Sequence, residues 1–109
     1  MHELGITQEI IAIACEQARG ARVRRVVLVI GKLSAVLPDA VRFCFDLCSE
    51  GTPVEGATLE IVEAPGRARC RECGTEVVLS GPLVSCPCGS MALDWLAGEE
   101  LIVQELELA

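Results

Sequence analysis

The segment at residues 66–98 limits most strongly what this chain can fold into. It contains glycines, prolines and four cysteines, and it has no convincing hydrophobic periodicity. A connection of this length is unusual inside a compact domain unless something other than an apolar core orders it. The four cysteines are spaced Cys70-x-x-Cys73 and Cys86-x-Cys88, with twelve residues between the two pairs. Four thiolates suit tetrahedral Zn(II), so we expect an inserted zinc unit that folds when it binds the metal.

The two cysteine pairs differ in their local chemistry. A glycine follows each pair, Gly74 and Gly89, and lets the chain double back as a zinc knuckle requires. The second pair has a single intervening residue, Pro87, which has no N–H to donate to a sulfur. We therefore expect a tighter chelate there with fewer supporting hydrogen bonds. The alternatives are a redox pair at Cys70 and Cys73 or unrelated free thiols, but no thioredoxin-like pattern surrounds these cysteines.

Length, charge and composition exclude several classes of function. A chain of 109 residues allows one domain of ordinary size with a small appendage. A net charge of −7 and an aromatic content of 3% argue against nucleic-acid binding. The apolar runs are shorter than the roughly 20 residues of a membrane span. No basic, apolar leader precedes a cleavage site, so we expect a cytoplasmic protein with reduced thiols.

Hydrophobic periodicity predicts two helices and three strands outside the cysteine segment. The expected helices lie at residues 4–18 and 38–51, and the expected strands at residues 23–33, 57–65 and 100–109. The last strand alternates, with Ile102, Gln104, Leu106 and Leu108 on one face and Val103, Glu105 and Glu107 on the other. The predicted fold class is α+β, with two helices on a small mixed three-stranded sheet and an inserted zinc-ribbon-like domain.

The predicted domain organisation follows from the same pattern. Residues 1–65 form an α/β domain, and residues 99–109 complete it with the final strand. Residues 66–98 form the inserted four-cysteine domain. Because the insert lacks an apolar core of its own, we expect the metal to supply most of its order.

The remaining cysteines, the arginines and the tryptophan have simpler interpretations. Three cysteines lie in helical apolar patterns and are expected in the core: Cys15, Cys44 and Cys48. Because Cys44 and Cys48 are one helical turn apart, a metal shared by these two residues stays open as an alternative. Four arginines form either a solvated connection or a docking patch for an acidic partner: Arg19, Arg22, Arg24 and Arg25. Trp95 either packs the cysteine unit onto the main domain or lies at a partner interface.

Several stretches together resemble one known family. They are "MHELGITQEII", "RVVLVIGKLS", "VRFCFDLCSEGT", "EGATLEIVE", "CRECG", "CPCGS" and "GEELIVQELEL". In this order they resemble the HypA/HybF family of hydrogenase maturation nickel metallochaperones, over essentially the whole chain. The initial Met-His-Glu and the four-cysteine insert are the most specific elements. The family usually has two residues between the second pair of cysteines, so "CPC" is a departure from its pattern.

The resemblance implies two metals with different roles. It implies a transient Ni(II) cargo at Met1, His2 and Glu3, beside a structural Zn(II) at Cys70, Cys73, Cys86 and Cys88. The terminal amine, the amide nitrogens and the imidazole of His2 can form fused chelate rings around one ion. Such nitrogen-rich tetragonal sites suit Ni(II), whereas thiolates favour zinc. Without the resemblance, His2 would be interpreted as a solvated terminal residue.

The resemblance also implies partners and argues against catalysis. The expected partners are the nickel-delivering GTPase of hydrogenase maturation and the nickel-iron hydrogenase large subunit, and a homodimer stays open. An enzyme is not expected, because His2 is the only histidine and the chain has no glycine-rich phosphate loop. The competing hypothesis is a zinc-ribbon protein-interaction module without a nickel role.

Overall fold

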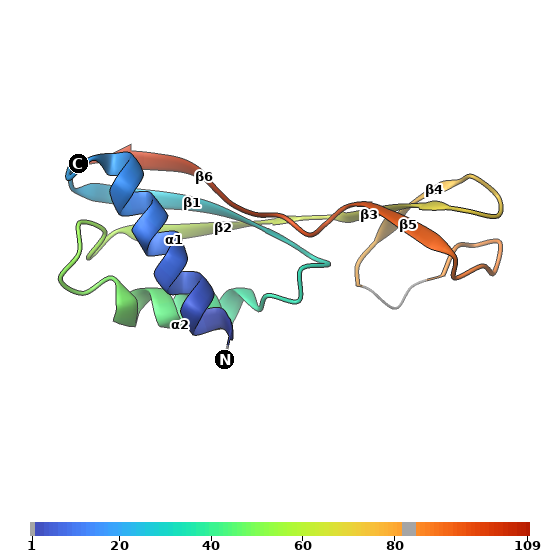
Figure 1. Cartoon of the computed structure of the whole chain (residues 1–109), viewed down its shortest axis with the longest axis horizontal. Coiled ribbons are helices and arrows are strands. Elements are labelled where there is room, and N and C mark those ends of the chain that lie inside the picture. The colour runs from blue at the N-terminus through green and yellow to red at the C-terminus, as the bar shows by residue number, and fades with distance from the viewer. Residues whose placement is uncertain (1, 82–84) are drawn as a thin grey trace. The chain divides into compact units, whose positions relative to one another are not determined.

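The computed structural model describes residues 2–81 and 85–109. In chain order the elements are α1 (His2–Ala18), β1 (Val23–Gly31), α2 (Pro38–Cys48), β2 (Thr58–Ala64), β3 (Gly66–Cys70), β4 (Glu76–Leu79), β5 (Leu93–Ala97) and β6 (Leu101–Leu108) (Figure 1). The strands form two three-stranded sheets, ordered β2-β1-β6 and β4-β3-β5. Within the described part of the chain, no helix has the length and apolar character needed to cross a membrane.

The chain divides into two compact units. The first comprises the residues up to Val29 together with Val36–Val62 and Ile102–Ala109, and the second comprises Ile30–Ala35 and Glu63–Leu101. The β4-β3-β5 sheet lies in the second unit, and most of the β2-β1-β6 sheet lies in the first. The predicted α+β fold class, with two helices and small sheets, is therefore what the chain adopts.

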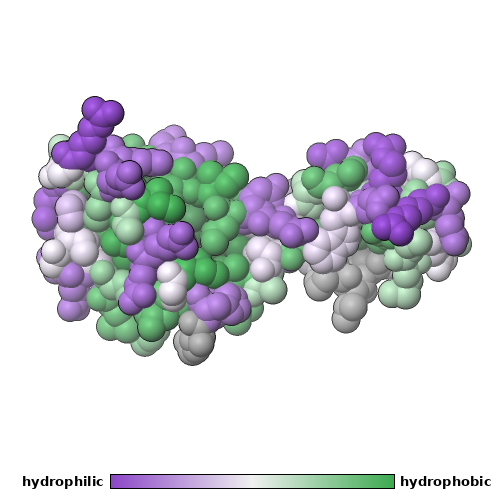
Figure 2. Space-filling model, in the orientation of Figure 1, coloured by the Kyte–Doolittle hydropathy of each residue, from purple (hydrophilic) through white to green (hydrophobic). Residues whose placement is uncertain are grey.

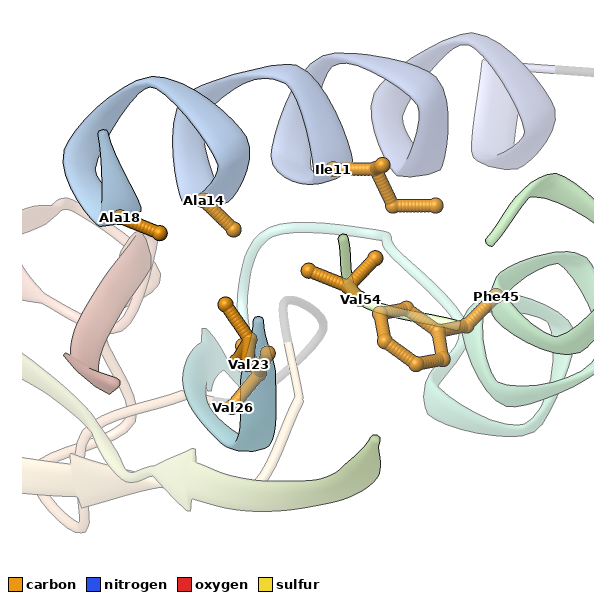
Figure 3. Packing of buried hydrophobic residues seen from close by; sticks show 7 residues of the cluster. All are labelled: Ile11, Ala14, Ala18, Val23, Val26, Phe45 and Val54. Atoms are coloured by element: carbon orange, nitrogen blue, oxygen red, sulfur yellow. The ribbon is translucent and has the colours of Figure 1, made fainter. Parts of the chain in front are cut away.

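The core of the first unit lies between its helices and the strand β1. It is a cluster of buried residues that α1, β1, α2 and the loop after α2 supply: Ile11, Ala14, Ala18, Val23, Val26, Phe45 and Val54 (Figure 3). The α1 members recur every three to four residues, which places them on one face of the helix. Helix α1 ends at Ala18, and Gly20 follows with a φ of 82°, the left-handed conformation that a glycine commonly adopts after a helix.

The three cysteines outside the insert are buried or half-buried, as predicted. Cys44 is 4% exposed. Cys15 and Cys48 are half-buried and contact the core cluster. All three therefore act as small apolar side chains, and none of them joins the one cysteine cluster found among the described residues.

The predicted faces of β6 are wrong. Val103 and Leu106 pack against the core, whereas Ile102 is 50% exposed and Leu108 is 48% exposed. Strict alternation places Val103 and Leu106 on opposite faces, yet both contact the core. Hydrophobic alternation alone therefore does not identify which side chains of β6 are buried.

Two of the four arginines lie in β1 and form ion pairs across the sheet. Arg24 pairs with Glu107 on β6, and Arg25 pairs with Glu60 on β2. Arg25 also lies 3.1 Å from a carboxylate oxygen of Glu105 on β6. These arginines are therefore strand residues bound to acidic neighbours, which argues against their serving as a docking patch.

The second unit contains strands that the sequence did not predict. Strand β3 pairs antiparallel with both β4 and β5. Along β3 the buried residues are Gly66, Ala68 and Cys70, and they alternate with the exposed Arg67 and Arg69. Because the buried positions carry small side chains, the alternation has almost no hydrophobic signal, and the segment resembles an irregular loop.

Leu33, from the connection after β1, completes the core of the second unit. It is 6% exposed and packs with Ala68 and Leu79. Its backbone N–H donates to the carbonyl oxygen of Gly98 at 2.7 Å. A Cβ added to Gly98, whose φ is +120°, would lie 2.7 Å from the Cα of Gly66 and 2.8 Å from Cγ of Leu33. The small residues around Leu33 thus leave the space that its side chain fills.

Replacing Leu33 with alanine is expected to destabilise the second unit by about 2–5 kcal/mol, the usual cost of a buried leucine-to-alanine change. Thermal unfolding followed by the fluorescence of Trp95, the one tryptophan and a residue of this unit, measures the effect. The matched control is Leu96→Ala, because Leu96 is 47% exposed. The control should stay within about 0.5 kcal/mol of the parent. Equal loss in both variants would contradict a core role for Leu33.

Candidate metal centres

The four predicted cysteines of the second unit converge in the structure. The sulfur atoms of Cys70, Cys73, Cys86 and Cys88 all lie within 4.8 Å of one another. The first pair ends β3 and enters the turn before β4. The second pair follows residues 82–84, which lie outside the described part of the chain. The structure therefore brings together all four residues that the spacing singled out.

Backbone hydrogen bonds shape each cysteine pair into a tight turn. The N–H of Gly74 donates to the carbonyl oxygen of Cys70 at 3.0 Å, and the N–H of Gly89 donates to that of Cys86 at 2.8 Å. The N–H of Cys73 also lies 3.5 Å from Sγ of Cys70. Gly74 and Gly89 have φ angles of 76° and 95°, which L side chains rarely adopt. The backbone conformation of these turns thus explains why a glycine follows each cysteine pair.

The distances between the sulfurs match the size of a zinc ion. Cys70 Sγ lies 3.7 Å from Cys88 Sγ, and Cys73 Sγ lies 3.5 Å from Cys86 Sγ. In a tetrahedron with Zn–S bonds of about 2.3 Å, the sulfurs are about 3.8 Å apart. No disulfide joins these thiols, since all four cysteines are free. The donor set and its spacing therefore fit Zn(II).

The first pair has thiols that ionise readily. The hydroxyl and backbone N–H of Thr75 lower the pKa of Cys73 to about 6. The backbone N–H of Cys73 lowers the pKa of Cys70. Sγ of Cys73 lies 3.2 Å from Oγ1 of Thr75, close enough for the hydroxyl to stabilise a thiolate. The lowered pKa values of the first pair thus favour the thiolate form, which binds a cation.

The second pair shows the opposite balance. The backbone N–H of Cys88 favours the thiolate of Cys86, but desolvation and the neighbouring thiols raise the pKa of Cys86 to about 12. For Cys88, the backbone N–H of Ser90 and the thiol of Cys86 favour the thiolate, while partial desolvation and the first pair raise its pKa overall. Four thiolates this close together repel one another, so a dication is what would allow all of them to ionise. The N–H groups of Cys88 and Ser90 also supply the sulfur contacts that Pro87 cannot make.

The N-terminal residues are the second predicted metal site. His2 lies in the first turn of α1, and its Nε2 is 3.1 Å from Oε2 of Glu3. The side chain of His2 is 60% exposed, whereas that of Glu3 is 9% exposed. The structure therefore brings His2 and Glu3 together, with the imidazole on the surface and the carboxylate beneath it. Met1, the third predicted residue, lies outside the described residues.

Glu3 is held by a residue that the sequence analysis missed. The backbone N–H of Leu37, at the N-terminus of α2, lies 3.5 Å from Oε2 of Glu3. The free N–H groups at a helix N-terminus favour a nearby carboxylate. The hydroxyl of Thr7 donates to the carbonyl oxygen of Glu3 at 2.7 Å. Pro38 and Asp39 in the sequence indicate the start of this helix, but neither links it to Glu3.

Together, these features define a small α+β protein with a cluster of four cysteines in one unit and a histidine–carboxylate pair at the start of the other. A family model described as "HypA: Hydrogenase/urease nickel incorporation, metallochaperone, hypA" matches residues 1–108. The chain belongs to the HypA family of hydrogenase maturation factors, as the sequence resemblance indicated.

Individual relatives agree with this assignment. The chain is 61% identical to the hydrogenase maturation factor HypA of Trichormus variabilis, over 99% of this chain and 96% of the relative. It is 47% identical to that of Geotalea uraniireducens, over 99% of both chains. The solution structure of the Ni metallochaperone HypA from Helicobacter pylori has the same fold, with a TM-score of 0.69 at 26% identity, over 97% of this chain and 96% of that chain.

Proposed function

We propose that this protein carries Ni(II) at its N-terminus and delivers it during the maturation of nickel-iron hydrogenase. The observation that carries the proposal is the exposed imidazole of His2, which lies beside the buried carboxylate of Glu3 at the start of α1. Membership of a family of nickel metallochaperones supports it. The proposed role is that of a carrier, not a catalyst.

The position of His2 in the helix supplies nitrogen ligands at little structural cost. The first four N–H groups of an α-helix have no acceptor within the helix. The amide nitrogens of His2 and Glu3 lie in this first turn, so both can deprotonate and bind a metal without breaking helical hydrogen bonds. With the terminal amine of Met1 and the imidazole, they form the nitrogen-rich set that favours Ni(II).

The contact between His2 and Glu3 suggests which imidazole nitrogen binds nickel. Nδ1 of a histidine closes a six-membered chelate ring with its own amide nitrogen, whereas Nε2 points away from that ring. Nε2 of His2 is the atom that lies 3.1 Å from Glu3. A metal-bound histidine commonly donates its second ring N–H to a carboxylate, which fixes the orientation of the ring. We therefore assign Glu3 an orienting role through its side chain and a ligand role through its amide.

The same proposal assigns a structural Zn(II) to Cys70, Cys73, Cys86 and Cys88 in the second unit. Its support is the spacing of the four sulfurs, which fits the ion. Nickel would thus be the transient cargo of the first unit, and zinc the permanent ion of the second. Nitrogen and sulfur donors would keep the two metals apart by their chemical preferences.

The proposed partners follow from the proposed delivery of nickel. A hydrogenase maturation factor acts with other maturation proteins, and we propose a nickel-delivering GTPase and the hydrogenase large subunit as the two partners. Both would meet the carrier in the cytoplasm, where the thiols stay reduced. A homodimer would be compatible with the same function. If nickel binding proves nonspecific, the remaining hypothesis is a zinc-ribbon interaction module.

A two-residue Gly-Ser extension before Met1 is expected to abolish the high-affinity nickel site. The extension moves the terminal amine away from His2 and breaks the fused chelate, while α1 keeps its packing. Calorimetric nickel titration of zinc-loaded protein with and without the extension measures the loss. The same extension at the C-terminus is the control and should leave the nickel affinity unchanged. Equal nickel affinity in all three proteins would overturn the proposed function.

A further inference from the structure

A hollow in the second unit surrounds the chain's one tryptophan. Its volume is about 330 Å³, and it is lined by one continuous stretch of chain: Trp95, Leu96, Ala97, Gly98, Glu99 and Glu100. Trp95 is 42% exposed and Leu96 is 47% exposed. The hollow thus combines an accessible aromatic ring with apolar and acidic neighbours. None of these residues belongs to the cysteine cluster or to the N-terminal pair.

The acidic side chains of the hollow form no ion pair with a basic residue in the described part of the chain. Among the ion pairs of the described residues, none involves Glu99, whose side chain is exposed. Glu100 accepts a hydrogen bond from the N–H of Gly98 at 2.8 Å, which holds its carboxylate at the hollow. Arg67 pairs with Glu76 instead, and Arg71 lies 2.7 Å from Asp94.

Close packing fixes the backbone of Gly98, one of the residues that line this hollow. Gly98 has a φ of +120°, and an added Cβ would collide with Gly66 and Leu33. Its carbonyl oxygen accepts the N–H of Leu33 at 2.7 Å. The turn from β5 into the stretch with Glu99 is therefore fixed by buried packing on one side, while the other side faces solvent. Figure 2 shows hydrophilic and hydrophobic residues interleaved on the surface of the lobe that carries β3–β5.

We propose that this hollow binds an arginine or lysine side chain from a basic segment of a partner protein. A cation over an indole ring is attracted by the ring's electron density, and Glu99 and Glu100 would add charge attraction. Leu96 offers an apolar contact for a residue that flanks the cation. A nucleic acid or an anionic membrane would instead be repelled by these carboxylates and by the net charge of −7. The inference rests on the second unit alone and does not depend on nickel binding.

The fluorescence of Trp95 tests this proposal directly, because no other tryptophan contributes to the emission. The probe is a blocked five-residue peptide of alternating leucine and arginine, titrated into the zinc-loaded full chain. The reference probe replaces each arginine with glutamine. We expect a saturable change in emission with the arginine peptide and at least 10-fold weaker binding of the glutamine peptide.

Two charge-matched variants separate a specific site from general attraction. Glu99→Gln should weaken binding of the arginine peptide by about 3- to 30-fold. Glu63→Gln should leave the affinity unchanged, because Glu63 is an exposed residue of the same unit outside the hollow. By calorimetry, Trp95→Leu should weaken binding by a similar factor. Equal weakening by Glu99→Gln and Glu63→Gln, or equal binding of both peptides, would overturn the proposal. So would a concentration-dependent shift in emission without peptide, because the hollow would then be filled by a second copy of the chain.

Discussion

Replacing His2 with alanine is expected to lower the affinity for Ni(II) by more than about 100-fold. Loss of a partner that only orients a ligand typically costs 10- to 100-fold, and loss of the ligand itself should cost more. Because the side chain of His2 is 60% exposed, the substitution removes no core packing, and the thermal stability of the zinc-loaded protein should stay unchanged. Calorimetric nickel titration beside thermal unfolding measures both quantities.

Variants at neighbouring positions distinguish a ligand from an orienting residue. Glu3→Ala should lower the affinity for Ni(II) by about 10- to 100-fold. Glu3→Gln should lower it less, because the amide oxygen of glutamine still accepts the imidazole N–H. Gln8→Ala, at an exposed position of the same helix, is the control and should bind as the parent does. If His2→Ala retains the parent affinity, the carrier hypothesis fails and the zinc-ribbon interaction module becomes the better account.

Replacing Cys70 with serine is expected to release zinc and unfold the second unit. A structural zinc site supplies folding free energy of about 10–16 kcal/mol in small metal-dependent domains. The described apolar core of this unit is small, with Leu33, Ala68 and Leu79 as its buried cluster. The loss of one thiolate therefore removes more stability than these side chains can replace. Metal analysis of the purified protein and the emission of Trp95 report the two effects.

The matched control for this experiment is Cys15→Ser. Cys15 is half-buried in the first unit, and it is not one of the clustered cysteines. The control should keep one zinc per chain and the parent emission spectrum, at a modest cost in stability. A Cys70→Ser protein that keeps stoichiometric zinc and a folded second unit would show that the four thiols are not the zinc site.

The parts of the fold that the sequence predicted are those with strong, local signals. Three patterns each predict the local structure from a few neighbouring residues. They are the 3.6-residue spacing in α1, the run of valines and isoleucines in β1 and the glycine after α1. The cysteine spacing was equally direct, because a metal site needs specific atoms at specific separations. These features could be read from the sequence without knowing what they pack against.

The missed features depend on partners far away in the sequence. Leu33 completes a core with Ala68 and Leu79, and no sequence pattern near Leu33 indicates this role. The carboxylate of Glu3 is held by the N–H of Leu37, a backbone group that carries no sequence signal. Strand β3 buries glycine, alanine and cysteine, so its alternation has little hydrophobic contrast. In each case the information lies in tertiary packing, which no local pattern contains.

The pairing of β6 with β1 has a consequence for how this chain is made. Strand β6 follows the whole second unit in the sequence, yet it completes the sheet that β1 began. During synthesis on the ribosome, the first unit must therefore wait with an open edge on β1 until the cysteine segment has been translated. An unpaired strand edge is a template for wrong pairing, so this interval is the stage of synthesis at which β1 is most exposed to wrong partners.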